Sequence, residues 1–362
     1  MSFEVKLKLS ADDGAKASNM NIIGCDYSAA KAQPNATWLA SGNLSSEGLA
    51  CGQLNIDRLE KIGSDKLLEY LLSLTGASGS GSGRRGDSPR GAGPGDSAPE
   101  RRTNDAWLIG LDFPFSLPRQ FIEILLKTNR VLNAGSSANF IASNAAVPWV
   151  EVAEQISQLT YNELVALVQA AKPIMGGEVK RQADNSTDPK AQSPLHQINP
   201  GMLKMTWQGM QLLLALHQQG FSILPFTKGT GLNNPSAADV IEVYPAAVLK
   251  ARGLPWRKYK GKDQEAKQLR QFILSNLTDH SDKLRTVNRI NSSQVKLELA
   301  PHLEQIALDS DDALDAVIAA VGAANACLNP SQTAPPSHIL PHTIALEGWI
   351  YVPYPKTVQA TT

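Results

Sequence analysis

The chain has 362 residues, no net formal charge at pH 7 and an apolar share of 42%. These values are typical of a soluble globular chain with one large domain or two ordinary ones, and they exclude an overall charge that attracts nucleic acid or acidic lipid. The three cysteines contain no C-x-x-C pair, which argues against a disulfide framework, a disulfide-linked partner and a zinc ribbon. There is no signal-like N-terminus and no membrane-length apolar run, so we expect a cytoplasmic protein.

The first part of the chain predicts three strands over residues 21–56. The segment NIIGCDYSA is a buried run ending in Asp26, and ATWLASGNL and GLACGQLNI follow it around a hairpin turn at 45–48. From Ile56 the apolar residues recur at helical spacing, which predicts a helix. Residues 76–104 are rich in Gly, Ser, Pro and Arg with almost no apolar side chains, so we expect a disordered loop insertion.

The remaining elements alternate between strands and helices. The strand in DAWLIGLD ends at Asp112, and the strands FSILPF and ADVIEVYP come later in the chain. A polar excursion over the surface is expected at 176–200. Helices are expected from about residue 116, over 150–171, over 202–219, near 245–252, near 263–277, as shorter pieces near 280–300 and over 310–328. This order predicts an α/β protein with a mixed sheet flanked by helices.

Acidic residues end several apolar runs, and a carboxylate at the edge of a core is costly unless it is paired or holds a metal. Asp26 and Asp112 end two strands, and if these strands are neighbours, both carboxylates project from the edge where open α/β sheets bind ligands. On the last helix Asp315 is i+3 from Asp312 and i+4 from Asp311, and it is the residue best placed to reach the sheet. Whether Asp311 or Asp312 acts with it stays open.

Each acid also fits a purely structural role when it is considered alone. Asp26 can cap the turn that follows it, Asp112 can accept hydrogen bonds from amides beyond Pro114, and the acids at 309–312 suit a helix N-terminus. Considered together, with the two strand-end acids each preceded by I-G-x, they favour a Mg²⁺ or Mn²⁺ site. Two such ions about 3.5–4 Å apart can serve phosphodiester displacement without histidine or cysteine.

Six segments spread along the chain form a recognisable pattern: GCDYSA, GLDFPFSLP, VIEVYPAA, the KYKG element, DDALDAVIAA and EGWIYVP. Together they resemble domain-of-unknown-function family 429 (DUF429), predicted nucleases of the ribonuclease H-like superfamily. The resemblance extends from about residue 21 to 355 and is interrupted by the 76–104 insertion. It implies one ribonuclease H-like domain over 21–355 with helical insertions, preceded by an extension at 1–20. The fold implied is a five-stranded mixed sheet, an antiparallel meander followed by parallel strands, with helices on both faces.

The resemblance also implies roles for particular acids. It assigns the first-strand acid to Asp26 and the fourth-strand acid to Asp112. The segment DALDAVIAA at 312–320 looks like the D-x-x-D-A closing helix of Holliday-junction resolvases, which places the last acids at Asp312 and Asp315. Glu242 matches the E-V-Y-P element of the family, as a further ligand or as a residue that orients the attacking water.

The segment KARGLPWRKYKGK at 250–262 interleaves basic residues with two aromatic ones. Such a stretch can neutralise phosphates and stack on bases, and we consider Lys258, Tyr259 and Lys260 as substrate-binding residues. A solvated loop explains the same pattern equally well. Arg181 is a further candidate for substrate contact, although an ordinary surface position is the stronger interpretation there.

The sequence therefore predicts a hydrolase, a Mg²⁺- or Mn²⁺-dependent nuclease whose metal ligands are Asp26, Asp112, Asp312 and Asp315. Its substrate would be DNA or RNA. Two alternatives remain open. One is an ATP-binding phosphotransferase related to the actin-like ATPases, which share this kind of sheet. The other is a catalytically inactive binding module.

Overall fold

The computed structural model describes residues 20–27, 37–45, 52–75, 106–132, 148–198, 201–227, 238–278 and 295–353. The strands are β1 (Met20–Asp26), β2 (Thr37–Ser45), β3 (Gln53–Ile62), β4 (Trp107–Leu111), β5 (Ser222–Ile223), β6 (Ala238–Glu242) and β7 (Lys296–Leu299). The helices in the first half are η1 (Ser64–Lys66), α1 (Leu67–Thr75), α2 (Arg119–Leu132), α3 (Trp149–Gln158), α4 (Tyr161–Met175) and α5 (Gln182–Ser186). Those that follow are α6 (Met202–Gln218), α7 (Pro245–Ala251), α8 (Gln264–Thr278), α9 (Pro301–Asp309), α10 (Asp311–Leu328), α11 (Pro330–Thr333) and α12 (Pro341–Glu347).

Within these ranges the strands form one mixed sheet of seven strands in the order β5-β6-β4-β1-β2-β3-β7. The strands β1, β2 and β3 form an antiparallel meander. On the other side of β1, the strands β4, β6 and β5 run parallel to it, and β7 pairs in parallel with β3 at the far edge. The point where the meander gives way to parallel pairing is β1, so the carboxyl ends of β1 and β4 lie side by side.

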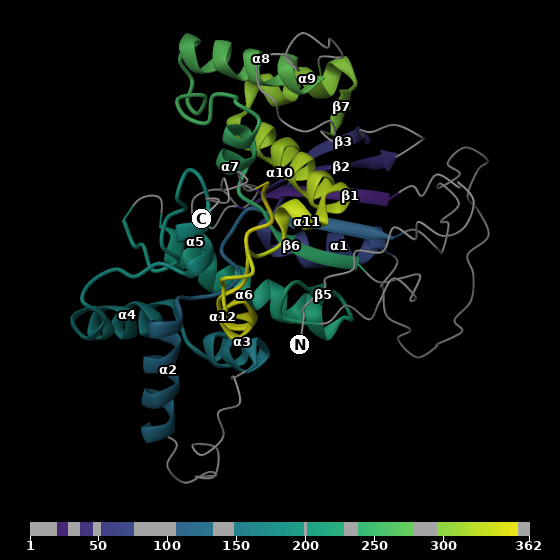
Figure 1. The fold of residues 1–362 in the computed structure, drawn as a ribbon. Coiled ribbons are helices and arrows are strands. Elements are labelled where there is room, and N and C mark those ends of the chain that lie inside the picture. Colours follow the sequence, from purple (N-terminus) through teal and green to yellow (C-terminus); the bar gives the residue numbers. More distant parts are fainter. Residues whose placement is uncertain are drawn as a thin grey trace, which may run out of the picture.

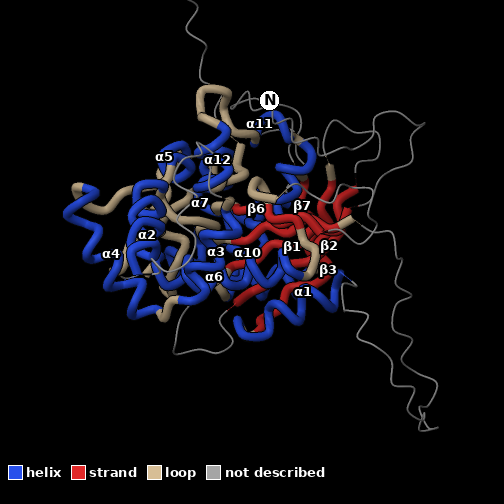
Figure 2. Tube along the Cα trace, turned by 90° about the horizontal axis from the view of Figure 1, so that it is seen from below, coloured by secondary structure: helices blue, strands red, loops and turns tan. Residues whose placement is uncertain are grey.

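Helices cover both faces of the sheet, as Figures 1 and 2 show. Alternate residues of each strand enter two separate apolar cores. Ile22 and Leu108 belong to the core that contains α7 to α10, whereas Ile23 and Ile109 belong to the core that contains α1 to α4 and α6. The sheet is therefore the middle layer of three, and a residue's position in the strand alternation decides which core it faces.

Helix α10 lies against β1, β2 and β4 (Figure 1). Its side of the sheet carries two glycines, Gly24 on β1 and Gly110 on β4. A Cβ on Gly24 would overlap the backbone of α10 at Ala316 and Ala320, and one on Gly110 would lie 3.0 Å from the Cβ of Ala323. The glycines and the alanine-rich helix thus allow a close approach of α10 that larger side chains would prevent.

The sequence predictions agree with much of this architecture. The three N-terminal strands, the strand before Asp112, the strands near 222 and 238, and the helices at 202–218, 245–251, 264–278 and 311–328 are confirmed. The region predicted as one helix over 150–171 forms two, because Thr160 begins α4 with a capping box that involves Glu163. The predicted turn at 45–48 and the insertion at 76–104 lie largely or wholly outside the described residues.

Three predictions about the fold were wrong. The sheet has seven strands and not five, because β5 and β7 extend its two edges. The helix predicted from Ile56 begins only at Leu67, since β3 continues to Ile62 and pairs with β2 along its whole length. Residues 296–299, expected within short helices, form β7. Pairing with a neighbouring strand overrides the local periodicity in both segments.

Candidate metal centre

Asp26 and Asp112 lie at the carboxyl ends of two neighbouring parallel strands. Cys25 pairs with Leu111 in the register of β1 and β4, and the Asp112 amide donates a 3.0 Å hydrogen bond to the Cys25 carbonyl. Each aspartate is two residues beyond a glycine, Gly24 or Gly110, that faces α10. Because side chains two residues apart share a face of a strand, both carboxylates project toward α10.

The third acid comes from α10. Asp315 lies in its second turn, one residue before Ala316, whose carbonyl lies against Gly24. Helix α10 thereby brings Asp315 onto the sheet edge, and one carboxylate oxygen from each of Asp26, Asp112 and Asp315 lies within 4.8 Å of the others. Asp315 has no exposed surface and the other two are half-buried. Three of the four predicted metal ligands therefore converge.

Convergence of like charges in a buried site perturbs the titration of these acids. Burial and the charge of Asp315 raise the pKa of Asp112 to about 8, against an opposing effect of Lys260. Burial and the neighbouring charges of Asp315 and Asp112 raise the pKa of Asp26 well above its ordinary value. Within the described part of the chain, neither carboxylate has a hydrogen bond or an ion pair. The charge of Lys260 therefore offsets only part of the mutual repulsion of the acids.

Asp315 differs from the other two acids because both of its oxygens have partners. The hydroxyl of Tyr259 donates a 2.7 Å hydrogen bond to Oδ1, and Nζ of Lys260 lies 2.6 Å from Oδ2. The charge of Asp315 raises the pKa of Lys260, although burial opposes this. Both partners come from the predicted basic loop, which therefore meets the acids.

The two acids in the first turn of α10 have separate positions. Asp311 Oδ2 accepts a 2.9 Å hydrogen bond from the Gly261 amide. Asp312 is exposed and lies outside the group of three, although its charge contributes to the raised pKa of Asp26. Burial and the charges of Asp311 and Asp315 raise the pKa of Asp312 itself. Asp312 thus borders the site, while Asp311 anchors the basic loop.

Glu242, the remaining predicted catalytic acid, lies in a different environment. It pairs with Leu111 in the register of β6 and β4, so it faces the opposite core from Asp26 and Asp112. Its oxygens bind Arg181 at 2.5 and 2.8 Å and the Phe115 amide at 3.0 Å. The prediction that Glu242 completes the acid cluster is not supported, because the strand alternation turns its side chain away.

Arg181 likewise has a structural position and not the surface one considered from the sequence. Its guanidinium is fully buried between Asp184 and Glu242. Burial alone would lower the pKa of Arg181, but the charges of Asp184 and Glu242 outweigh burial and raise it. Because Arg181 has no exposed surface, a substrate outside the protein cannot contact it in this conformation.

Two residues that sequence reasoning missed support these clusters. Glu347, in α12, accepts hydrogen bonds of 2.7 and 2.6 Å from the amides of Arg119 and Gln182. Arg270, in α8, donates to the carbonyls of Tyr259 and Gly261 and so holds the basic loop. A sequence signal for Arg270 is its position among the buried apolar residues of α8, where an unpaired charge would be costly.

The aromatic residues of the basic loop do not provide the predicted stacking platform. Tyr259 is buried and its hydroxyl binds Asp315. Trp256 is in contact with the guanidinium of Arg257, 3.8 Å from the ring centroid, and with Lys250 at 5.3 Å. The exposed charges of Arg257, Lys258 and Lys260 remain available, so the loop contributes charge more than stacking surface.

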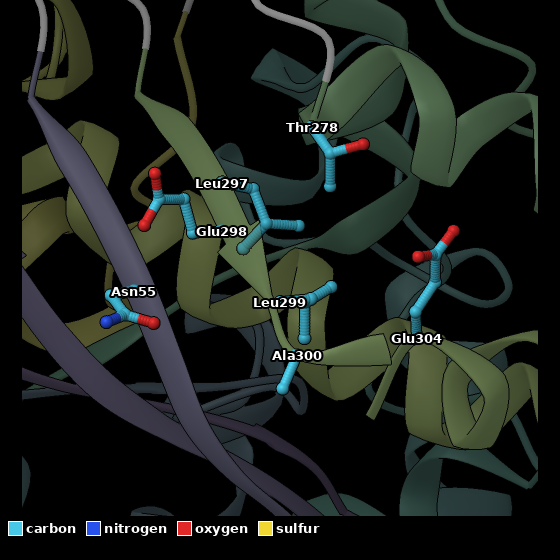
Figure 3. Close-up of a pocket in the computed structure, with 7 residues that line it drawn as sticks. All are labelled: Asn55, Thr278, Leu297, Glu298, Leu299, Ala300 and Glu304. Carbon is cyan, nitrogen blue, oxygen red and sulfur yellow. The ribbon is translucent and has the colours of Figure 1, made fainter. Parts of the chain in front are cut away.

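A separate hollow of about 380 Å³ lies beside β7, between Asn55 on β3 and Glu304 on α9 (Figure 3). Its lining includes none of the three clustered aspartates. Figure 3 shows the carboxylates of Glu298 and Glu304 on opposite sides of β7, so they do not converge on a common point. The chemistry of the acid cluster and this hollow are therefore unconnected.

The sequence model of a family described as "Protein of unknown function (DUF429)" matches residues 97–338. The chain belongs to the DUF429 family. The matched range contains Asp112, Asp315 and the basic loop, while Asp26 precedes it. No curated protein matches the chain, and no solved structure does. Among the described residues, no helix combines the length and the apolar character needed to cross a membrane.

Proposed function

We propose that this member of DUF429 is a divalent-metal-dependent phosphodiester hydrolase, a nuclease, with its centre at the three clustered aspartates. The observation that carries the proposal is the convergence of Asp26, Asp112 and Asp315 within 4.8 Å from two strands and one helix. Half-buried carboxylates without partners, such as Asp26 and Asp112, are costly beside a third acid unless a cation joins them. A site assembled at this cost from distant parts of the chain suggests a function beyond stability.

The donor atoms fit Mg²⁺ or Mn²⁺. All are carboxylate oxygens, which these hard cations prefer, and the group of three contains no histidine or cysteine. Asp26 and Asp112 would hold the ion with oxygens that have no other partner, and Asp315 would complete the set. A bound divalent ion would supply charge stabilisation for a transferring phosphoryl group and would acidify a coordinated water.

The residues of the chain itself have three tasks in this proposal. Tyr259 orients the Asp315 carboxylate by its hydrogen bond to Oδ1. Asp112, whose pKa of about 8 reflects burial and the neighbouring charge of Asp315, would bind the cation in its ionised form and give up its proton as the ion binds. The exposed cations Arg257, Lys258 and Lys260 would attract the phosphates of a DNA or RNA substrate.

We further propose that the fold is ribonuclease H-like. Support comes from the five central strands in the order β3-β2-β1-β4-β6, an antiparallel meander followed by parallel strands. The strands β5 and β7 would then be additions at the edges. Asp26 and Asp112 end the first and fourth strands and meet Asp315 of α10, so in such a fold they would be the first- and fourth-strand acids and α10 would be the closing helix.

Cleavage assays with single-stranded, duplex and branched nucleic acids test the proposal in Mg²⁺ and in Mn²⁺. We expect Asp26→Asn to lower the cleavage rate by at least about 100-fold, since even groups that only orient metal ligands contribute about 10–100-fold. Asp309→Asn is the matched control, because Asp309 is an exposed aspartate that pairs with Lys267 and takes no part in the cluster. Its rate should equal that of the wild type.

Three results would contradict the proposal. They are absence of cleavage with every substrate and both metals, equal activity in the wild type and Asp26→Asn, and equal losses in Asp26→Asn and Asp309→Asn. Calorimetric titration with ATP in parallel tests the phosphotransferase alternative, for which we expect no binding.

A further inference from the structure

The loop that meets Asp315 is held firmly on both sides of Lys260. It joins α7 to α8, and Lys258 and Gly261 have φ values of 64° and 120°. Arg270 Nη1 donates to the carbonyls of Tyr259 and Gly261 at 2.6 and 2.9 Å. The Gly261 amide in turn donates to Asp311. The backbone around Lys260 is therefore fixed to α8 and α10.

This anchoring directs a permanent cation into the acid cluster. Nζ of Lys260 lies 2.6 Å from Asp315 Oδ2, and its charge also acts on Asp26 and Asp112. Among the described residues, no other side chain forms an ion pair with any of the three aspartates. Lys260 thus supplies positive charge that balances part of the charge of the acids.

The charges decide how many ions the cluster suits. Three aspartates carry a formal charge of −3, and Lys260 reduces it to −2, which one divalent cation neutralises. A second divalent ion would give the three aspartates, Lys260 and both ions a net formal charge of +2. Asp312, exposed at the border of the cluster, would offset only part of this charge. Asp315 also has both oxygens occupied, so it is poorly placed to bridge two ions.

We propose that the centre takes one divalent cation, and that the ammonium of Lys260 supplies the second positive charge beside the phosphate. This inference rests on the proposed function and replaces the pair of ions expected from the sequence. The cation would be held chiefly by Asp26 and Asp112. Lys260, whose side chain is 59% exposed, would donate a hydrogen bond to a phosphate oxygen of the substrate.

Counting bound Mn²⁺ tests the inference without reference to activity. Calorimetry and electron paramagnetic resonance of the full chain should give one Mn²⁺ per wild-type chain. Lys260→Met removes the ammonium and keeps an unbranched apolar stem. It should raise the Mn²⁺ affinity by about tenfold or more, because one positive charge close to the ion is lost. The same variant should lose cleavage activity, since the phosphate loses its contact.

Lys262→Met is the matched control, because Lys262 belongs to the same loop and is exposed. Its Mn²⁺ affinity and stoichiometry should equal those of the wild type. Thermal melts of both variants establish that they fold. Two Mn²⁺ ions per wild-type chain would overturn the inference and leave the proposed nuclease intact, as would an unchanged or weaker affinity in folded Lys260→Met. Absence of Mn²⁺ binding in the wild type would overturn both.

Discussion

Among the described residues lie two clusters of three acids and one cation, and they differ in how their charges are satisfied. In the first, Asp184, Glu242 and Glu347 surround the buried Arg181 and also accept hydrogen bonds from backbone amides. In the second, Asp26 and Asp112 have no partner within the described residues, and Lys260 pairs only with Asp315. We call these the arginine cluster and the aspartate cluster.

The comparison separates a fully paired cluster of charges from an underpaired one. Arg181 is planar and presents several donors, so it satisfies two carboxylates at once and ties α5 to β6. Lys260 is a single cation on a partly exposed stem, and it leaves two neighbouring carboxylates unsatisfied. A fully paired cluster ties elements of the fold together, whereas in our proposal the underpaired one receives a cation.

The largest effect should come from breaking the arginine cluster. Arg181→Leu leaves Asp184 and Glu242 buried without their counter-charge and should lower the free energy of unfolding by about 3–5 kcal/mol. Denaturant unfolding at pH 7 measures this. Arg119→Leu is the control, because its pair with Glu123 is exposed, and it should change stability by less than about 1 kcal/mol. Similar losses in the two variants would remove the distinction between the clusters.

The next effect tests the packing that assembles the aspartate cluster. Gly24→Ala places a Cβ against the backbone of α10 and should destabilise the protein by about 1–3 kcal/mol while it moves Asp315 away from Asp26. Thermal melts and Mn²⁺ titration should therefore both show losses. Gly110→Ala meets the softer contact at Ala323 and should lose less in both measurements. An equal result for the two glycines would contradict the role given to Gly24.

The smallest effect concerns pH. The pKa of Asp112 is raised to about 8 in the folded protein, so its contribution to stability is fully present below about pH 4 and is lost as the pH rises through about 8. Without divalent ions, the wild-type melting temperature should fall between pH 5 and 9, and Mg²⁺ should restore it most at high pH. Asp112→Asn should flatten this profile and raise the metal-free melting temperature at pH 8 by about 2–4 °C.

Two outcomes would count against this account of Asp112. One is a profile that keeps its slope in Asp112→Asn, which would assign the titration to another group. The other is a metal-free melting temperature at pH 8 that falls in the variant. Glu242→Gln offers a contrast, because Glu242 forms an ion pair with Arg181. Removing the charge of Glu242 breaks this pair and should destabilise the protein.

The sequence by itself determined the order of most elements and the two strand-end aspartates. Alternating apolar residues and the I-G-x-D pattern are local signals, and they depend only on residues a few positions apart. The apolar helix with its early acids was also visible, as was the basic loop. Membership of DUF429 was evident from short segments spread along the chain.

Only the tertiary structure decided which acids meet. Glu242 ends a strand as Asp26 and Asp112 do, but its place in the strand alternation turns it to Arg181 on the other face, and local sequence does not state which face carries the site. The formation of β7 and of the last part of β3 depended on pairing with strands elsewhere in the chain. The position of Lys260 depended on Arg270 and Asp311, because a charge is placed in a cluster by contacts that span the whole fold.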